Sequence, residues 1–543
     1  MKKHYVEKGK LKWLEEFYSI GLSCFDEIDA KSYDNATILP IKPEYHHGRY
    51  MGKGGVIDAG GHYIENSYIS YGFGGGYVVK ECDYIDKKVV YCGSDHNAWG
   101  HFLVDVVPRL WLSLEDNLNK YSFVIVRNEL SNEDFLDNEY DFLCLLGIEK
   151  RTFIINRPVR FKTVIVPERS YDLDYSENGK SSRIHAYYLK IYKKVIERAL
   201  SEGKDLENNI KRIFFTRSGL SVNHWHDSGI EIIDSFFENN GYTIICPEKM
   251  RLRDFIVLLY NAEEVAYVSG TLQHNMLFAP EGKKAICLER KPMLVRYQTD
   301  IDLLKKIDVT YVSGTYSLWP GNVSISTMYA WTEKLNSFQN DSGWKLPDCN
   351  YLKQEYLAKN FDRYLSEFEC CDEWDTIQGM EHYFEIIGEN REEIGEVLGL
   401  DVSSPEMLRD KEKIRNDLSK TLLKRHTPYC RWKDGESLQF FTTATSIIDS
   451  CLKAGKENFL IFPYGNLGML FTLVLKERYG ITPKKIFDNK VSNWRSNVLK
   501  IKGIKKFLDD TTVVILTTRS KDCLLELSKH VDMKDVISPY TVI

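Results

Sequence analysis

The sequence predicts an α/β fold in which parallel sheets are divided over several domains. Apolar, strand-like runs alternate with amphipathic helical segments between residues 88 and 290, and again between residues 456 and 543. Strands separated by helices of about 10–15 residues are typical of parallel sheets with crossover connections. The chain has 543 residues, whereas one hydrophobic core stops growing at about 250–300 residues. We therefore expect more than one α/β domain.

The first domain, which we place at residues 1–205, is predicted to begin with strands and to end with a long helix. Residues 37–79 are rich in glycine and tyrosine and contain short alternating runs, which indicates strands joined by tight turns. Helical periodicity follows after Asn97 and again over residues 184–201. Four apolar runs are expected to be strands: Val89–Cys92, Phe123–Val126, Phe153–Ile155 and Thr163–Val166.

The second domain, at residues 206–325, has the clearest pattern of the chain. Over residues 211–290, short apolar strands alternate with helices expected at Ile230–Asn239 and Leu252–Ala262. This order predicts a parallel sheet with helical crossovers. Residues 326–435 are charged and helical in pattern, so we expect a helical linker there.

The last region, residues 436–543, again alternates strands and helices and is expected to be a small Rossmann-like domain. Its first strand leads into Gly465 and Gly468, and Asp488 ends the second strand about 20 residues later, in the manner of a dinucleotide-binding fingerprint. Pro463 stands where the first glycine of that fingerprint belongs. Nucleotide binding and a purely structural or assembly role both remain open for this domain.

Composition excludes several functional classes. The net charge of -6 gives no sign of a nucleic-acid-binding surface. An apolar run long enough to span a membrane is missing, and the N-terminus alternates charged and apolar residues, unlike a signal peptide. The 12 cysteines form neither a CxxC pair nor a cluster with zinc-ligand spacing, and Cys370 and Cys371 are adjacent. We expect reduced thiols, a cytoplasmic location and no bound metal.

Asn97, His101 and Asp105 form the first candidate site. Spaced four residues apart, they share one face of the expected helix. A histidine oriented by a carboxylate is a plausible general base. In the structural alternative, Asp95 caps the helix, Asp105 pairs with Arg109, and His101 is an ordinary interface histidine.

The second candidate site lies at the ends of two expected strands in the second domain. Thr216 ends the expected strand RIFFT and Arg217 directly follows it, where ligands bind in open α/β sheets and where a guanidinium can bind phosphate oxygens. The other strand runs into a turn of small and polar residues whose backbone N–H groups suit a diphosphate: Ser269, Gly270, Thr271, His274 and Asn275. The alternatives are a surface arginine paired with a carboxylate and an ordinary strand–loop–helix junction.

Taken in order, these stretches resemble glycosyltransferase family 61. The resemblance rests on Asn97, on His101-Phe102 and Asp105 ahead of Val107-Pro108-Arg109-Leu110, on Arg217 after its strand, and on the block Asn275-Met-Leu-Phe278-Ala-Pro280-Glu-Gly282. It extends from residue 88 to residue 292. One departure is the turn Ser269-Gly270-Thr271-Leu272-Gln273-His274, where many members have Gly-x-His-Gly-Ala.

The resemblance implies a GT-B fold, with an acceptor-side and a donor-side Rossmann-like domain around a cleft, and an inverting transfer without an essential metal. It implies that His101 or Asp105 is the base, that Arg217 and the 269–275 turn bind the donor diphosphate, and that Trp99 and Arg109 lie on the acceptor side.

The implied partners are a nucleotide-sugar donor, most simply UDP-linked, with no other cofactor, and a glycan or lipid-linked acceptor of capsular or lipopolysaccharide type. The enzyme would then work in the cytoplasm, at the inner face of the membrane. Three alternatives remain: a metal-dependent site at the DxD of Asp172 and Asp174, a non-catalytic assembly scaffold, and a nicotinamide-dependent sugar-nucleotide enzyme built on the C-terminal domain.

Overall fold

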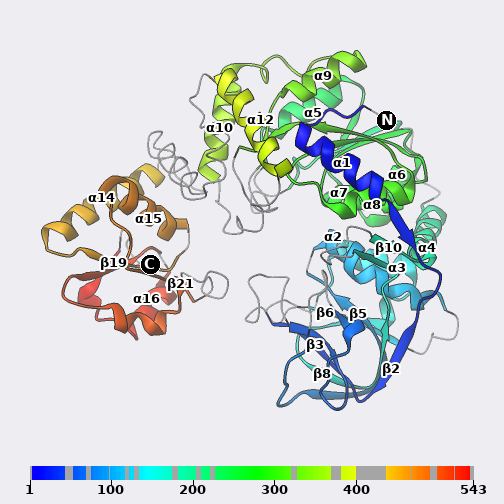
Figure 1. Cartoon of the computed structure of the whole chain (residues 1–543), viewed down its shortest axis with the longest axis horizontal. Helices are drawn as coiled ribbons and strands as arrows, with labels where there is room; N and C mark the ends of the chain where they lie inside the picture. The colour runs from blue at the N-terminus through cyan, green and yellow to red at the C-terminus, as the bar shows by residue number, and fades with distance from the viewer. Residues whose placement is uncertain are drawn as a thin grey trace. The chain divides into compact units, whose positions relative to one another are not determined.

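The computed structural model describes residues 3–42, 53–68, 75–96, 98–115, 121–127, 134–173, 182–203, 210–220, 227–318, 327–367, 381–398, 436–464, 466–489, 498–518 and 520–538 (Figure 1). The chain divides into two compact units. The first comprises Met1–Ser317, Tyr329–Lys353 and Glu381–Glu393, and the second comprises Leu318–Met328, Gln354–Met380 and Ile394–Ile543.

The first unit opens with a seven-stranded mixed sheet in the order β4-β3-β8-β5-β6-β7, with β2 also pairing with β8. Its strands are β2 (Ala30–Asp34), β3 (Thr37–Lys42), β4 (Lys53–Ile57), β5 (Asp83–Ser94), β6 (Ser122–Val126), β7 (Thr152–Ile155) and β8 (Val159–Pro167). Strands β8, β5, β6 and β7 run parallel, whereas β2 and β3 run antiparallel to β8. The four strands expected in this part of the chain are confirmed.

Helices cover one face of this sheet. They are α3 (Asp137–Leu146) and α4 (Ala186–Glu202), which confirms the helix expected over residues 184–201. Their apolar residues, among them Phe142 and Tyr192, are fully buried against Phe123 and Ile125 of β6. A small three-stranded sheet, β1-β10-β9, lies beside the start of α4 and consists of β1 (Leu22–Cys24), β9 (Tyr171–Leu173) and β10 (Ser182–Ile184).

The segment that carries His101 is helical, but it is not the regular α-helix that the spacing predicts. It consists of α2 (Trp99–His101), a π turn η4 (Phe102–Val106) and a 3-10 helix η5 (Val107–Leu114). Pro108 has no backbone N–H, so it can donate neither to Val104 in an α pattern nor to Leu103 in a π pattern. Side chains replace it: Arg169 Nη2 donates to the Val104 carbonyl at 2.8 Å, and the Tyr192 hydroxyl donates to the Leu103 carbonyl at 2.9 Å.

The second sheet of the first unit is parallel and has five strands in the order β13-β11-β14-β15-β16. They are β11 (Arg212–Phe215), β13 (Thr243–Ile245), β14 (Glu264–Val268), β15 (Lys284–Glu289) and β16 (Asp308–Ser313). The helices are α5 (Ile230–Asn239), α6 (Leu252–Asn261), α7 (Thr271–His274), the 3-10 turn η9 (Asn275–Phe278), α8 (Arg296–Lys305) and α9 (Glu333–Ser342). The expected parallel sheet and its two helices are confirmed.

The order of the strands fixes where a ligand is expected. In the five-stranded sheet, β11 comes first along the chain. Strand β13 follows on one side of it and β14 on the other, so the direction of winding reverses between β11 and β14. Ligands of open parallel sheets bind outside the carboxyl ends of the strands at such a switch point. Thr216 and Ser269 directly follow these two strands.

One continuous hydrophobic core joins the seven-stranded and the five-stranded sheets of this unit. It includes Val90 and Phe123 of the first sheet and Ile213 and Val265 of the second, packed with α3, α4 and α6. The opposite face of the second sheet is covered by α5 and α9, where Phe214 stacks on Phe237 at a centroid distance of 4.4 Å.

The N-terminal helix α1 (Lys8–Ile20) packs on the same unit. Its buried Lys10 lies 3.2 Å from the Glu7 carboxylate and 3.1 Å from the Ser313 hydroxyl of β16. Gly9 contacts the backbone of α12 (Glu381–Leu398), since an added Cβ would lie 2.2 Å from the His382 carbonyl oxygen. Short elements complete the unit: β12 (Asp227–Ser228), β17 (Thr315–Tyr316), and the 3-10 turns Glu65–Ser67, Glu149–Arg151 and Pro247–Lys249. Strand β18 (Thr327–Tyr329) spans the boundary in sequence between the two units.

The second unit ends in a five-stranded parallel sheet in the order β21-β20-β19-β22-β23, which confirms the parallel alternation expected there. Its elements are α10 (Gln354–Glu367), α14 (Glu436–Lys453), β19 (Asn458–Phe462), α15 (Asn466–Tyr479), β20 (Lys485–Phe487), β21 (Val498–Leu499), η12 (Ile501–Phe507), β22 (Thr512–Leu516), α16 (Lys521–Ser528), η13 (Met533–Asp535) and β23 (Val536–Ile537). Helices α14 and α15 cover one face, and η12 and α16 cover the other (Figure 1).

Two further expectations concern the chain as a whole. Within the described residues, no helix has the length and apolar composition needed to cross a membrane. The nine cysteines in the same ranges are free thiols, as expected. Cys370 and Cys371 lie outside the described residues.

Candidate active site

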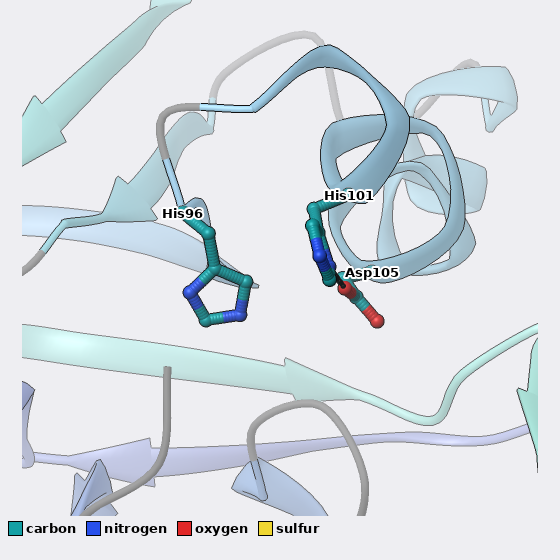
Figure 2. A group of neighbouring side chains, drawn as sticks. All are labelled: His96, His101 and Asp105. Carbon is teal, nitrogen blue, oxygen red and sulfur yellow. Dashed lines mark hydrogen bonds and ion pairs between the residues drawn. The ribbon is translucent and has the colours of Figure 1, made fainter. Parts of the chain in front are cut away.

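His101 and Asp105 form a hydrogen-bonded pair on the irregular helix. His101 Nδ1 lies 2.8 Å from Asp105 Oδ2, across the π turn (Figure 2). The His101 side chain is 30% exposed, whereas Asp105 is 2% exposed. A carboxylate at Nδ1 favours the tautomer with the proton on Nδ1, which leaves the lone pair of the neutral ring on Nε2. The pair therefore has the arrangement of an oriented base.

The environment sets the charge of both groups. Burial lowers the pKa of His101, but its hydrogen bond to Asp105 and the charges of Asp105 and Asp95 outweigh burial, so the pKa is raised overall. Burial raises the pKa of Asp105, but His101 and Arg169 outweigh it and hold the pKa well below its usual range. Arg169 Nη2 lies 3.3 Å from Asp105 Oδ1. Asp105 is therefore a permanent anion and His101 is the group that exchanges a proton.

His96 completes a group of three that offers metal-ligand atoms within 4.8 Å of one another, with His101 and Asp105 (Figure 2). Its ring meets that of His101 edge to face at a centroid distance of 5.0 Å. Burial and the charge of His101 lower the pKa of His96 to about 3, so His96 is neutral. One oxygen of Asp105 already accepts from His101, and Arg169 brings a positive charge to the other. This charge opposes a cation at the same place.

The turn after β14 lies directly against the helix that carries the pair. Trp99 Nε1 donates to Asn275 Oδ1 at 2.7 Å, and the Trp99 ring stacks on Phe278 at a centroid distance of 6.3 Å. A Cβ added to Gly100 would lie 2.8 Å from His274 Nδ1, which shows how closely the two segments approach. The first and second candidate sites therefore meet at this contact.

His274 contributes a half-buried, neutral imidazole, whose two ring nitrogens are buried, to the meeting point. Neither of its ring nitrogens makes a hydrogen bond of good geometry to the described residues. Burial and the charge of His101 lower its pKa to about 4, although Asp105 and the backbone of Gly100 act in the opposite direction. A neutral histidine can donate or accept a hydrogen bond toward a sugar or phosphate oxygen.

Gly270 sets the shape of the same turn. Its φ of 115° lies in a region that favours glycine. Ser269, at the base of the turn, accepts a hydrogen bond from the backbone N–H of Arg290 through its hydroxyl oxygen, at 3.0 Å. Thr271 is exposed. Because α7 has only four residues, side chains are the main means of holding a ligand here.

Thr216 and Arg217 are tied to two carboxylates at the end of β11. The Thr216 hydroxyl donates to Asp234 at 2.6 Å. Arg217 Nε donates to Asp227 Oδ2 at 2.7 Å, and Arg290 Nη1 lies 3.3 Å from the other oxygen of Asp227. The predicted surface pairing of Arg217 thus exists, but the pair is buried and shared with a second arginine.

Two alternatives raised for the first site are wrong. Asp105 pairs with His101 and Arg169, whereas Arg109 is fully buried and donates to the carbonyl of Tyr68 at 3.0 Å. Asp95 caps no helix but bonds Arg127 Nε at 2.7 Å. Pro108 explains the first difference, because the irregular turn separates the directions of residues 105 and 109.

The remaining predicted residues lie elsewhere or outside the described ranges. Asn97, Asp174 and Gly465 fall outside the described residues. Asp172 of the DxD accepts from the Tyr68 hydroxyl at 2.6 Å and lies 3.5 Å from both Arg169 and Arg183, so two cations already surround it.

In the second unit, Gly468 allows α15 to pack closely on β19. A Cβ there would lie 2.7 Å from the Pro463 carbonyl oxygen. Asp488 follows β20 and is 8% exposed.

Sequence reasoning missed several residues of this region. In the fold, the two candidate sites are surrounded by five further residues: Arg169, His96, Arg290, Lys291 and Tyr329. Arg290 and Lys291 could have been found, because they directly follow β15 at the sheet edge where ligands bind. Arg169 and Tyr329 carry no such signal.

Comparison with known proteins gives one family match. Residues 99–286 match the model of a family described as Glycosyltransferase 61. No curated protein matches the chain in sequence.

One solved structure is similar over 51% of this chain and 97% of its own chain, with 9% sequence identity and a TM-score of 0.22: a glycosyl transferase of family 9 from Veillonella parvula DSM 2008. At that TM-score the likeness supports no inference about this chain.

Proposed function

We propose that this chain, whose residues 99–286 match the model of Glycosyltransferase 61, is a glycosyltransferase that moves a sugar from a nucleotide-sugar donor to a growing bacterial surface polysaccharide or glycan. The transfer inverts the anomeric centre and needs no metal ion. The catalytic base is His101, oriented by Asp105. No further cofactor takes part.

One observation carries this proposal. The turn after β14, which we assign to the donor, contacts the helix that holds the His101–Asp105 pair, through the 2.7 Å hydrogen bond from Trp99 to Asn275. A direct displacement needs a proton acceptor and a leaving-group site on opposite sides of one sugar carbon. Two segments 176 residues apart in sequence come together with complementary chemistry for these tasks.

The reaction uses the groups in a fixed order. Nε2 of His101 takes the proton of the acceptor hydroxyl as its oxygen bonds to the anomeric carbon of the donor sugar. The bond from that carbon to the diphosphate oxygen breaks, and the nucleotide leaves with the electron pair. Asp105 stabilises the imidazolium that forms, because its carboxylate stays charged.

The donor side comprises Thr216, Arg217 and the turn from Ser269 to Asn275. Arg217 binds the diphosphate, and the neutral imidazole of His274 bonds the sugar or a phosphate oxygen. Asn97 belongs with the catalytic pair. On the acceptor side, Trp99 contributes contacts, and the buried Arg109 supports the helix through its hydrogen bond to the Tyr68 carbonyl. In a GT-B arrangement, the first domain (1–205) binds the acceptor and the second (206–325) binds the donor.

The remaining regions and partners complete the proposal. The segment 326–435 links the transferase to the C-terminal unit, 436–543, in which Gly465, Gly468 and Asp488 are candidates for nucleotide contact. The donor is most simply UDP-linked. A lipid-linked or glycan acceptor would bring the cytoplasmic enzyme to the inner face of the membrane.

The test is transfer by the purified full chain, after a thermal-shift screen of UDP-, GDP- and CMP-sugars identifies the donor. His101→Ala is expected to lower kcat by roughly 10²–10⁴-fold with donor binding retained. His62→Ala is a matched control, since His62 also faces an aspartate four residues away, at 3.3 Å, but is 83% exposed. Unchanged turnover in both His101→Ala and Asp105→Ala would refute the assignment.

The metal claim has a separate test. Activity is expected to persist in EDTA, and loss that Mn²⁺ or Zn²⁺ restores would instead support a metal at His96, His101 and Asp105. A chain that binds the nucleotide sugar but transfers nothing would support the scaffold alternative.

A further inference from the structure

One buried amide lies inside the turn that follows β14. Of the four residues of α7, each of which the structure describes, Gln273 alone is buried, whereas Thr271 is exposed and His274 is half-buried. A helix of four residues has little stability of its own. The direction in which α7 presents its outer side chains therefore depends on what binds the Gln273 side chain from the interior.

Both ends of the Gln273 amide have partners. Its Nε2 donates to the Tyr311 hydroxyl of β16 at 2.7 Å and lies 3.5 Å from Asp302 Oδ2 of α8. The Cys287 thiol of β15 lies 3.7 Å from its Oε1. Hydrogen bonds are directional, so partners on three different elements fix the orientation of the amide as well as its position. An apolar side chain of the same length would fill the space without fixing this orientation.

Asp302 is the acceptor that this group of side chains shares. Its Oδ2 also accepts from the Tyr311 hydroxyl and from the Tyr18 hydroxyl of α1, the latter at 3.3 Å. Burial raises the pKa of Asp302 to about 7, and the hydrogen bonds from Tyr311, Tyr18 and Gln273 act against that rise. Asp302 is only 3% exposed. A buried carboxyl group is costly unless hydrogen bonds satisfy it, so these three donors determine where Asp302 lies.

The two residues after the buried amide are those that reach the helix of the proposed base. His274 follows directly, and its Nδ1 would lie 2.8 Å from a Cβ added to Gly100. Asn275 comes next, and its Oδ1 accepts from Trp99 Nε1 at 2.7 Å. A rotation of α7 that released the amide from its partners would therefore change both contacts with the helix.

We propose that Gln273 is a positioning residue for sugar transfer: Tyr311 and Asp302 fix its amide, and the amide fixes the direction in which the rest of the turn faces the proposed base. This deepens the proposed function and rests on it, because that function assigns the turn to the donor. Gln273 touches no substrate and acts through the two residues that follow it. The N-terminal helix takes part through the hydroxyl of Tyr18.

The contact between the turn and the helix can be measured without an assay of activity. In a proton–nitrogen TROSY spectrum of the full chain, the indole N–H of Trp99 is one of 10 tryptophan signals and is assigned by its loss in Trp99→Phe. Gln273→Met keeps the length of the side chain and removes the amide. The Trp99 signal is expected to move upfield in this variant, because the hydrogen bond to Asn275 lengthens. A signal at the wild-type position would overturn the proposal.

A second variant keeps the test valid if Gln273→Met does not fold. Tyr311→Phe removes only the hydroxyl that accepts from Gln273 and donates to Asp302. The Trp99 signal is expected to move in the same direction as in Gln273→Met. An unshifted signal in a folded Tyr311→Phe would also overturn the proposal.

Tyr267→Phe is the matched local control. The Tyr267 hydroxyl is buried on the neighbouring strand β14 and interacts electrostatically with Asp302, but it makes no hydrogen bond to the described residues. Its removal is expected to leave the Trp99 signal in place. A shift as large as that in Gln273→Met would show that any change in this part of the core moves the turn, and would refute a specific role of the amide.

The two substitutions of Asp302 separate its shape from its charge. Asp302→Asn keeps an oxygen that can accept from Tyr311, so the Trp99 signal is expected close to its wild-type position. Asp302→Leu removes the acceptor and should shift the signal as Gln273→Met does. A wild-type signal in both variants would show that Asp302 has no part in positioning the turn.

Steady-state kinetics separates positioning from stability. Gln273→Met is expected to lower kcat/KM for the donor at least tenfold, since a displacement of about 1 Å can cost about 10²-fold in rate, while the KM of the acceptor stays the same. Thr152→Val is the control for stability, because it removes a buried hydrogen bond of 2.9 Å, from the Thr152 hydroxyl to the Ile148 carbonyl, in the seven-stranded sheet. It should lower Tm and leave kcat/KM unchanged.

The two measurements also distinguish this proposal from the proposed function. A lower Tm in Gln273→Met with wild-type kcat/KM and an unshifted Trp99 signal would overturn the positioning role, while sugar transfer by the wild type stood. A shifted Trp99 signal in Gln273→Met, in a chain whose wild type transfers no sugar, would keep Gln273 as the residue that positions the turn and would instead refute the proposed function.

Discussion

The pKa of His101 depends on two opposite effects: burial, which lowers it, and Asp105, which raises it. Burial by itself would leave the imidazole neutral and weakly basic, whereas Asp105 at 2.8 Å restores and raises its affinity for a proton. Arg169 in turn keeps Asp105 ionised from the far side. Arg169 thus keeps Asp105 charged, and the charge of Asp105 in turn raises the pKa of His101.

This arrangement predicts a pH profile. Below the raised pKa of His101, the ring is protonated and cannot accept the acceptor proton, so kcat/KM should fall as pH decreases. Asp105→Asn removes the charge of Asp105 and its hydrogen bond as a carboxylate, which raise this pKa most, and leaves burial, which lowers it, opposed by the charge of Asp95 alone. The acidic limb should therefore move to lower pH, and kcat at the optimum should fall by roughly 10²–10⁴-fold.

The measurement is kcat/KM against pH for wild type, Asp105→Asn and His62→Ala. An acidic limb that stays in place in Asp105→Asn would show that another group controls the rate. A limb that moves to higher pH would contradict the sign of the interaction between His101 and Asp105.

At the residue scale, the sequence predicts partners that are close along the chain and misses those that are distant. The spacing of His101 and Asp105 indicated their contact, which the structure confirms. Arg169 reaches Asp105 from 64 residues away, so no local pattern could reveal it. For the same reason, Arg217 was expected to pair with a carboxylate, but its sharing of Asp227 with Arg290 could not be foreseen.

At the element scale, the helix that carries the pair depends on side chains from other elements. The Tyr192 hydroxyl of α4 satisfies the Leu103 carbonyl that Pro108 cannot. Tyr192→Phe should therefore lower the free energy of unfolding by about 0.5–1.5 kcal/mol. It should also lower kcat, because the Leu103 carbonyl of the π turn then keeps only the longer hydrogen bond from the Tyr188 hydroxyl, at 3.2 Å. Denaturant titration and steady-state kinetics measure the two effects.

Tyr187→Phe serves as the control on the same helix, since its hydroxyl bonds the half-buried Glu115 at the protein surface. Tyr192→Phe with wild-type kcat would show that the turn holds its shape by itself.

A buried ion triad joins the carboxyl ends of β5 and β6 to α3. Arg127 bonds Asp95 and Glu139 at 2.7 Å each, and all three side chains are at most 1% exposed. Burial and the charge of Asp95 raise the pKa of Glu139 to about 8. Arg127→Met removes the hydrogen-bond donor that both buried carboxyl groups share, and should destabilise the protein by about 3–5 kcal/mol. Arg157→Met is the control, because its ion pair with Asp83 is 63% exposed on each side and should contribute little. Urea titration compares the two; a similar loss in both would refute the triad's role.

Elements were predicted well where periodicity is regular. The α5 helix has the expected bounds, Ile230–Asn239, because its apolar residues repeat at helical spacing and Gly241 follows its end. The segment 99–114 also has helical periodicity, but one proline changes its hydrogen-bond pattern, and the tyrosines and Arg169 that compensate come from elsewhere.

At the scale of the whole molecule, the five-stranded sheet of the second unit has its own hydrophobic cores. Among the residues that the structure describes, the two hydrophobic clusters of that sheet consist of residues between Ala444 and Ile537. The segment Glu381–Glu393, in contrast, belongs to the first unit, where Glu389 lies against Lys334 and Glu393 accepts from Tyr316 at 2.8 Å. A chain cut after residue 330 would lose these contacts.

Removal of residues 436–543 should therefore leave the Tm of the first unit unchanged, whereas removal of everything after residue 330 should lower it. Calorimetry and transfer assays on the two truncated chains test this. Loss of transfer in the 1–435 chain would assign the C-terminal sheet a direct part in the reaction.

The sequence indicates parallel sheets but not the order of their strands. Alternation of strands and helices is visible in the letters, whereas the position of β11 between β13 and β14 is set by packing across the whole sheet. The mixed first sheet illustrates the same limit, since β2 and β3 pair antiparallel with β8 from more than a hundred residues away.

The side chains that cap the Leu103 and Val104 carbonyls matter to anyone who would retarget the enzyme. Mutant libraries are usually confined to positions expected to touch a substrate, and Tyr192 and Arg169 would be treated as free scaffold positions. Because they hold the backbone on which the reacting imidazole is mounted, their codons should be kept fixed while acceptor preference is varied.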